Sequence, residues 1–383
     1  MHLLTTALAE QPSGTFEDLF SRCLLCGACE QVCPRQLPIT DIISQARSTF
    51  SPFYGPNGLK KAAACTALSH PELLDGLVKA GISLQRLHAL PALSGLRLKL
   101  GLSEERTGAS QSKNNDTLSQ EYQVEQPASS LSYFTGCLAR HIQPSIAEAT
   151  QTLLSKSNLP LAQIPADQYC CGLAAWSAGK REQARELARK NIRAFSAPSL
   201  ADTPIITSCA SCSSHLLAYP TLFDEHDPWH RKALAFSDRV REFTSFFDDK
   251  LPVSLRVDTP EHPGQRIFYH DPCHLRFKDK GVSAPRSLLQ KTGVHILEPE
   301  EGPLCCGQGG LFHIACPEHS LQIFQKSSRQ ALAGSPDCVT TTCSGCLMQY
   351  QEGLARQRQQ IKVIQVVHMA VILVDKLSRQ GHS

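Results

Sequence analysis

Hydrophobic positions along the chain alternate between short apolar runs and amphipathic helical patterns. The apolar runs predict buried strands at residues 131–134, 204–207, 266–269 and 338–341. Spacing of three to four residues predicts helices over 144–155, 181–195, 285–291 and 318–332. Strands that alternate with helices in this way predict small parallel α/β sheets. A last apolar stretch, 361–374, predicts a buried strand and helix, because polar residues interrupt it and a membrane span needs roughly 20 apolar residues.

The same pattern divides the chain into five regions. Residues 1–50 carry closely spaced cysteines and predict a small helical, ferredoxin-like domain. Residues 51–103 are rich in leucine and alanine, with helical spacing over 71–80 and 84–93. Residues 104–129 are polar and predict a flexible linker. Residues 130–250 and 251–383 then form two related α/β domains.

These two domains are an internal repeat, defined by five cysteines in each copy. Each copy contains one cysteine, then a Cys-Cys-Gly, then a Cys-x-x-Cys. The candidate ligands are Cys137, Cys170, Cys171, Cys209 and Cys212 in the first copy and Cys273, Cys305, Cys306, Cys343 and Cys346 in the second. Equivalent cysteines lie 134 to 136 positions apart. Because open parallel sheets gather ligands at the carboxyl ends of their strands, we expect these cysteines in the loops there.

The number of cysteines also indicates the cellular compartment in which the protein works. The chain has 383 residues and 17 cysteines, an odd number that argues against a framework of disulfides. It opens without a basic segment followed by a long apolar core, so no signal peptide is predicted. We expect a cytoplasmic protein with metal-bound thiolates, and any membrane contact to be peripheral, on the inner face. The formal net charge of +3 is too small to indicate a nucleic-acid partner.

The N-terminal cysteines form a ferredoxin-type run. Cys23, Cys26, Cys29 and Cys33 follow the spacing C-x₂-C-x₂-C-x₃-C-P, which holds cubane [4Fe–4S] clusters. A zinc site is the alternative, but no histidine accompanies these cysteines. In two-cluster ferredoxins the fourth cysteine of each run ligates the other cluster, and only one run is present here. Either Cys33 binds its own cube, or a distant thiol such as Cys65 completes it, or a partner run is missing.

Each five-cysteine set differs from a simple zinc site. A structural zinc ion takes four ligands, whereas five thiolates suit an iron–sulfur cluster of unusual shape. The adjacent cysteines serve one site only if the loop bends sharply, and Gly172 and Gly307 permit that bend. Zinc in the first copy is a minority alternative and would leave one cysteine free.

Three segments carry a specific resemblance, namely Phe134-Thr135-Gly136-Cys137, His270-Asp271-Pro272-Cys273-His274-Leu275 and Cys305-Cys306-Gly307-Gln308-Gly309-Gly310. They resemble the cysteine-rich CCG domains of heterodisulfide reductase subunits, glycolate oxidase iron–sulfur subunits and lactate-utilisation iron–sulfur proteins. A ferredoxin run followed by two CCG domains is most similar to the glycolate oxidase subunit. The resemblance implies noncubane [4Fe–4S] clusters on both five-cysteine sets. Residues 1–9 resemble the helical stretch that joins two ferredoxin runs in related proteins, so we also hypothesise that the chain starts late.

No catalytic residue is assigned, because no dinucleotide fingerprint, P-loop or zinc-protease motif is present in the sequence. The expected function is therefore an electron-transfer subunit of an oxidoreductase complex. The resemblance implies a separate FAD-containing 2-hydroxy-acid (glycolate or lactate) oxidase subunit as the electron donor and quinone or another carrier as the acceptor. The alternative is a heterodisulfide-reductase-like subunit whose CCG clusters cleave a disulfide.

Several histidines, one tryptophan and three further cysteines are also candidates for a role near these sites. His270 and His274 flank Cys273 and either donate hydrogen bonds to cluster sulfurs or pack the strand end. Packing is the favoured interpretation for His141, His215 and Trp176. Cys65, Cys316 and Cys338 fall outside both cysteine patterns and are expected to be buried small hydrophobes.

Overall fold

The computed structural model describes residues 20–49, 57–86, 131–157, 159–160, 162–251, 264–279, 281–357 and 364–379. The N-terminal part is helical, as expected. Its described helices are α3 (Ala28–Gln31), α4 (Ile39–Thr49), α5 (Gly58–Ser69) and α6 (Pro71–Arg86). The predicted linker over 104–129 and the segment 1–9 lie outside the described residues, as does most of the helical pattern predicted over 84–93.

The first repeat contains a three-stranded parallel sheet in the order β1-β2-β3, with Tyr133 beside Ile206 and Ile206 beside Arg241. Its elements are β1 (Ser132–Phe134), α8 (Cys137–His141), α9 (Pro144–Lys156), α10 (Leu173–Ser177), α11 (Arg181–Ala194), β2 (Ile205–Thr207), α12 (Ala210–Leu217), η1 (Tyr219–Leu222), α13 (Pro228–Ser237), β3 (Val240–Glu242) and α14 (Phe243–Asp248). The predicted strands and helices of this copy are present within one or two residues of their expected bounds.

The second repeat contains a four-stranded parallel sheet in the order β5-β4-β6-β7. Its elements are β4 (Arg266–Tyr269), η3 (Leu275–Asp279), α15 (Ser283–Lys291), β5 (His295–Leu297), α16 (Phe312–Ala315), α17 (Pro317–Ala333), β6 (Cys338–Thr341), α18 (Ser344–Arg356), β7 (Gln365–His368) and α19 (Met369–Arg379). The first repeat has no full counterpart of β5 among its described residues. An isolated parallel bridge joins Ser132 of β1 to Gln163 at the position that β5 takes beside β4. Sequence periodicity did not predict β3 and β5, because three residues are too few to show a pattern.

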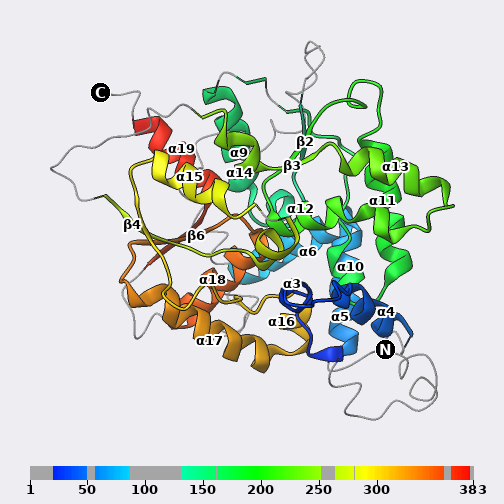
Figure 1. Ribbon diagram of the computed structural model, residues 1–383, viewed down its shortest axis with the longest axis horizontal. Coiled ribbons are helices and arrows are strands. Elements are labelled where there is room, and N and C mark those ends of the chain that lie inside the picture. Colours follow the sequence, from blue (N-terminus) through cyan, green and yellow to red (C-terminus); the bar gives the residue numbers. More distant parts are fainter. Residues whose placement is uncertain are drawn as a thin grey trace.

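The two repeats exchange their last helices across a shared core. In the first repeat α14 packs on α15 of the second, and in the second α19 packs on α9 of the first (Figure 1). One apolar cluster therefore mixes side chains of both copies, including Tyr133, Phe243, Leu288 and Leu373. This reciprocal packing holds the carboxyl ends of the two sheets in a set relation to each other.

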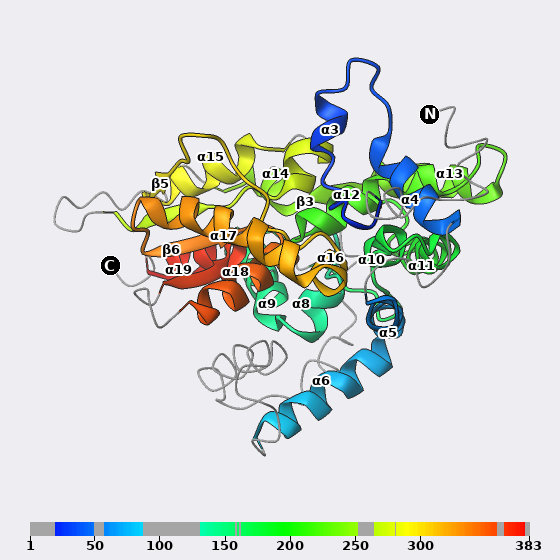
Figure 2. The ribbon, with the colours of Figure 1, turned by 90° about the horizontal axis from the view of Figure 1, so that it is seen from below.

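The N-terminal helices lie against both repeats. Figure 2 shows α3 and its flanking loops projecting from one side of the molecule, while α6 extends from the opposite side. Between them, α5 contacts α10 of the first repeat and α16 of the second. Within the described residues, no helix has both the length and the apolar character needed to cross a membrane.

Candidate metal centre

The cysteines of both repeats stand where strands end and helices begin. Cys137 starts α8 directly after β1, and Cys209 and Cys343 precede α12 and α18 as their N-terminal caps. Cys212 and Cys346 follow one turn later in the same two helices. Thiolates are stabilised at helix N-termini by the unpaired N–H groups and the helix dipole. The expected position at the carboxyl ends of strands is confirmed for the cysteines that follow β1, β2, β4 and β6, whereas the Cys-Cys pairs lie in longer loops.

The Cys-Cys pairs turn sharply at the following glycine. Gly172 has a φ of 96° and Gly307 a φ of 87°, which are left-handed values that favour glycine. The Gly307 N–H points at Cys305 Sγ over 3.4 Å. A Cβ atom at Gly307 would lie 2.6 Å from the Ser320 carbonyl oxygen, whereas one at Gly172 would lie 3.4 Å from the Ala184 carbonyl oxygen. The bend is therefore more tightly confined in the second repeat than in the first.

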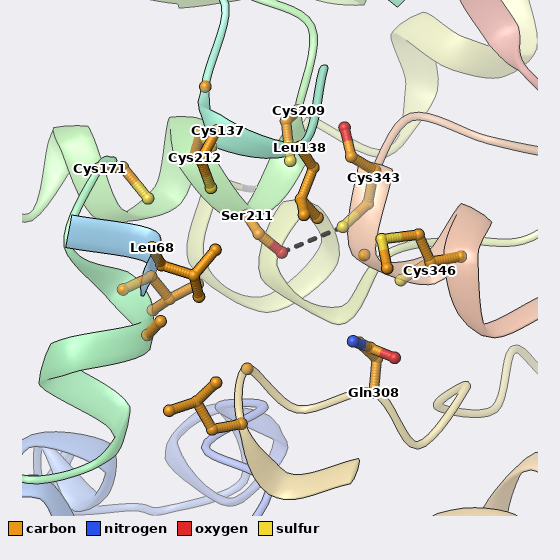
Figure 3. Close-up of a pocket in the computed structure, with 18 of the residues that line it drawn as sticks. Leu68, Cys137, Leu138, Cys171, Cys209, Ser211, Cys212, Gln308, Cys343 and Cys346 are labelled. Atoms are coloured by element: carbon orange, nitrogen blue, oxygen red, sulfur yellow. Dashed lines mark hydrogen bonds between the residues drawn. The ribbon is translucent and has the colours of Figure 1, made fainter. Parts of the chain in front are cut away.

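All ten repeat cysteines line a single cavity of about 340 Å³. Figure 3 shows Cys137, Cys171, Cys209 and Cys212 on one side of this cavity and Cys343 and Cys346 on the other. The Cys137 and Cys170 sulfurs are 3.7 Å apart, and the Cys306 and Cys346 sulfurs 3.4 Å. Two thiolates bound at about 2.3 Å to one tetrahedral metal lie roughly 3.8 Å apart. The sulfurs are thus spaced as ligands of a shared metal site, and none of the 17 cysteines, all of them described, is in a disulfide.

The electrostatics of the cavity also fit a bound cationic group. Hydrogen bonding to Cys170 raises the pKa of Cys137, and in the second repeat contact with Cys305 raises the pKa of Cys273. Sharing of that hydrogen bond lowers the pKa of Cys170 and of Cys305. Such crowded sulfurs repel one another when all are ionised, unless a metal neutralises them. Buried hydroxyls of Thr135 and Ser344 face the same cavity without a partner among the described residues, so donors for cluster sulfides are available.

Each cysteine set has a buried histidine near its Cys-Cys pair, and this histidine comes from a different place in each repeat. His270 lies three residues before Cys273, and its ring lies within 4.8 Å of the Cys306 and Cys346 sulfurs. His215 lies three residues after Cys212, and its Nε2 atom is buried near Gly172 without a hydrogen-bond partner in the described chain. Burial lowers the pKa of each imidazole to about 4. The nearby thiolate, Cys170 for His215 and Cys305 for His270, raises the pKa but by less than burial lowers it. Both histidines are therefore neutral at pH 7.

His215 packs against Trp176 and Tyr219, as interpreted from the sequence, and its Nε2 atom also lies near the loop of the first Cys-Cys pair. The repeat pattern marks neither histidine, because Phe134 occupies the place of His270 in the first repeat and Gln349 the place of His215 in the second. His270 also contacts the Tyr350 hydroxyl through Nδ1 at 3.4 Å, so it both packs and faces sulfur. His141 lies elsewhere, with its Nδ1 atom 2.5 Å from the Asp75 carboxylate of α6.

A contact across the repeat boundary joins the two Cys-x-x-Cys loops. The Ala210 N–H donates to the Thr342 carbonyl at 2.9 Å, and the Cys209 and Cys343 thiols interact directly. From the same loop, Ser211 Oγ lies 3.1 Å from Cys343 Sγ and 2.8 Å from His274 Nδ1. Figure 3 shows Ser211 reaching from the first repeat towards Cys343 of the second. His274 therefore contacts Ser211, and Ser211 contacts Cys343.

The ferredoxin-type run lies beside the second repeat. Burial raises the pKa of the Cys26 thiol, with further contributions from Cys305, Cys23 and Cys29. Leu24 lines the cavity, and a Cβ atom at Gly309 would lie 2.6 Å from its Cδ2 atom. The buried Arg47 guanidinium holds the run in place, because it donates to the Phe20 and Cys23 carbonyls and to the Ser177 carbonyl of α10. The run is thus anchored on the first repeat while Cys26 faces the second.

The structure separates the three options for the fourth ligand of the run. Cys33 follows α3 in a turn, half-buried, and is not among the main groups that shift the pKa of Cys26 or Cys29. Cys65 lies elsewhere, hydrogen-bonded to Gln183 at 3.2 Å, with Cys170 as its neighbouring thiol. Residues 1–19, where a preceding run would connect, lie outside the described residues. Cys65 is therefore not gathered with the run, and Cys33 stays a predicted ligand.

The remaining expectations concern packing residues. Cys65, Cys316 and Cys338 are buried in three different apolar clusters, as predicted. Trp176 packs between the N-terminal helices and the first repeat, also as predicted.

Comparison with known proteins agrees with these observations. Residues 131–217 and 267–351 match the family model of the cysteine-rich domain called CCG. The chain therefore contains two CCG domains, one in each repeat, which confirms the resemblance inferred from the sequence.

Several named proteins are similar to this chain. The chain is 27% identical to a probable glycolate oxidase iron–sulfur subunit of Bacillus subtilis, over 95% of this chain and 84% of that protein. It is 28% identical to lactate utilization protein A of Shouchella clausii, over 64% of this chain and 99% of the relative. It is also 28% identical to a dihydromethanophenazine:CoB–CoM heterodisulfide reductase subunit of Methanosarcina acetivorans, over 61% of this chain and 56% of the relative. These relatives and the two CCG domains support iron–sulfur clusters as the bound cofactors.

Proposed function

We propose that this chain is the iron–sulfur electron-transfer subunit of an FAD-dependent 2-hydroxy-acid dehydrogenase complex that acts on glycolate or lactate. A separate flavin subunit would oxidise the substrate, and electrons would pass singly through this chain to quinone or another carrier. The relatives named as glycolate oxidase and lactate utilization proteins support this assignment. We place the complex in the cytoplasm, with any membrane contact peripheral and on the inner face.

One observation carries the proposal. The ferredoxin-type run, the second cysteine set and the first cysteine set form a continuous row, in which Cys26 neighbours Cys305 and Cys343 neighbours Cys209. A cubane [4Fe–4S] cluster on Cys23, Cys26, Cys29 and Cys33 would be followed by two noncubane clusters, one on each five-cysteine set. Bound clusters would supply one-electron chemistry, and the cysteines of this chain would hold them in this order.

The surface of the run supports electron transfer into the chain at that end. Cys29 is exposed on α3, and Val32, which ends this helix, is 81% exposed. Figure 2 shows α3 projecting from the molecule, so a flavoprotein bound to α3 would lie close to the first cluster. Electrons would then move towards the cavity between the repeats.

A second candidate function is disulfide cleavage. Both cysteine sets open on the same cavity, which would give a disulfide access to two clusters at once. The reaction would add two electrons and two protons to one disulfide and release two thiols. The heterodisulfide reductase relative supports this alternative.

Metal analysis tests the proposal first. Anaerobically purified protein would be assayed for iron, zinc and acid-labile sulfide, with EPR spectra of oxidised and reduced forms. We expect about twelve irons and three clusters per chain. About four irons, with or without zinc in the first repeat, would contradict the two noncubane clusters and leave one working cluster.

A turnover assay separates the two functions. With the flavin subunit present, we expect glycolate or lactate to reduce the clusters of this chain. A viologen donor together with a mixed alkyl disulfide gives the contrasting assay. Thiol release at a rate that exceeds hydroxy-acid-driven reduction would favour disulfide cleavage over the relay.

A further inference from the structure

The two Cys-x-x-Cys loops differ at one position that faces the boundary between the repeats. Ser211 occupies this position in the first repeat and Gly345 in the second. Ser211 Oγ is 3.1 Å from Cys343 Sγ and 2.8 Å from His274 Nδ1. Gly345 has no side chain that returns such a bond to Cys209, and Leu138 occupies the place of His274 in the first repeat. The hydroxyl contact therefore runs in one direction only, from the first repeat to the second.

The protons in this contact have one consistent arrangement when Cys343 is bound to metal. A metal-bound thiolate has no proton and accepts hydrogen bonds, so the Ser211 hydroxyl donates to Cys343 Sγ. A hydroxyl has one proton, so the Ser211 oxygen accepts from the Nδ1–H of His274. This arrangement assigns a proton to Nδ1 of His274. His274 thus positions the serine, and the serine contacts the ligand.

A hydrogen bond to a cluster ligand changes the ease of reduction. The reduced cluster carries more negative charge, and a donor to its ligand sulfur stabilises that state and raises the reduction potential. Two other contributions are similar in the two repeats. A backbone N–H, from Gly172 or Gly307, donates to the first cysteine of each Cys-Cys pair, and a buried histidine, His215 or His270, lies near that cysteine. The cavity hydroxyls of Thr135 and Ser344 have no partner among the described residues, whereas the Ser211 hydroxyl contacts Cys343 directly.

We propose that Ser211 of the first repeat, positioned by His274, raises the reduction potential of the cluster held by the second repeat, so that this cluster is reduced before the first. The inference rests on the proposed function in one respect, that both five-cysteine sets carry clusters. The second site is also the one beside Cys26, so the electron would rest next to the run from which it arrives. The first cluster would be reduced only after the second.

The test is an EPR-monitored potentiometric titration of the full chain, purified anaerobically. Cys306→Ala assigns the signal of the second site by its loss. Ser211→Ala is expected to lower the midpoint potential of that signal, with a roughly tenfold smaller ratio of reduced to oxidised cluster at a fixed potential, as for loss of one charge-assisted hydrogen bond. Ser211→Thr retains the hydroxyl and is expected to restore the wild-type midpoint. Ser214→Ala, on the same helix but outside the cavity lining, is the matched control and is expected to change nothing.

Each outcome decides the question. An unchanged midpoint in Ser211→Ala, or a lowered one in Ser211→Thr, overturns the role of the hydroxyl. If Ser211→Ala loses second-site iron, the iron content and midpoint of Ser211→Thr decide, since recovery supports the proposal and no recovery overturns it. Wild-type protein with iron for one cluster would overturn the proposed function together with this inference. Two wild-type signals with unchanged midpoints in the variants would overturn the inference alone.

Discussion

The two repeats share the same five cysteines and differ in the side chains around them. Both present these cysteines at the carboxyl-end side of a parallel sheet, with a left-handed glycine after the Cys-Cys pair. Around these cysteines, Phe134 stands where the second repeat has His270, and Leu138 where it has His274. The cysteine set therefore defines the kind of site, while its neighbours distinguish one site from the other.

The repeats also face different parts of the N-terminal region. The second repeat contacts the ferredoxin-type run, through Cys26 and Cys305 and through Leu24 and Gly309. The first repeat instead has Cys65 of α5 near its Cys170, and the Cys65 thiol donates to Gln183. The N-terminal region therefore makes the two repeats unequal. The ferredoxin-type run lies beside the second cysteine set, so the row of cysteine sites has the run at one end and the first set at the other.

Removal of one ligand from each repeat is expected to have the largest effect. Cys171→Ala and Cys306→Ala occupy equivalent positions, and each should cost the chain one cluster, or about four irons. The EPR signal lost should differ between the two variants, because the surroundings differ. Iron analysis and EPR spectra of both variants, beside wild type, measure the effect. Loss of the same signal in both would show that the ten cysteines hold one joint site and would break the comparison.

The glycines after the Cys-Cys pairs should differ in their tolerance of a side chain. Alanine in a left-handed conformation costs about 1–2 kcal/mol, which is the expected cost of Gly172→Ala. Gly307→Ala adds a contact of 2.6 Å with the Ser320 carbonyl oxygen, so we expect its total cost to reach about 3 kcal/mol or more. Urea unfolding of the two variants and wild type gives the free energies. Equal costs would mean that the second bend is no more confined than the first.

The smallest effect is expected from the buried histidine of each repeat, His215 and His270, and it concerns the pH dependence of the free energy of unfolding. The pKa of each folded imidazole is about 4, below the ordinary value of 6.5, so the unfolded chain binds more protons between these values. Stability should therefore fall as the pH falls from about 6.5 to 4. Between pH 7 and 5.5 each histidine should account for about 1 kcal/mol.

Exchange of these residues for their counterparts separates the two contributions. His215→Gln and His270→Phe install the side chain that the other repeat has at the equivalent position. Each variant should lose less stability than wild type between pH 7 and 5.5, measured by urea unfolding at both values. A pH dependence that neither variant reduces would place the responsible groups elsewhere and would remove the histidines from the comparison.

Much of the fold could be predicted because its patterns are local. The strands that begin each repeat and the helices α9, α11, α15 and α17 have clear periodicity, and their predicted bounds lie close to those observed. Strands β3 and β5 have three residues each, and only their neighbours in the sheets define them. The packing of α14 on the second repeat and of α19 on the first could not be predicted. The apolar face of each helix indicates that it is buried, but not which repeat it packs against.

Residue type and spacing were enough to predict the ligands, because metal binding to thiolates depends on close spacing along the chain. They established the ferredoxin-type run, the two five-cysteine sets and their order. Tertiary packing was needed to establish that both sets line one cavity, that Cys26 lies beside the second, and that Ser211 reaches Cys343. It also placed His215 beside the first set. These relations join residues far apart in the chain, and they exist because the two sheets share a core that brings their carboxyl ends together.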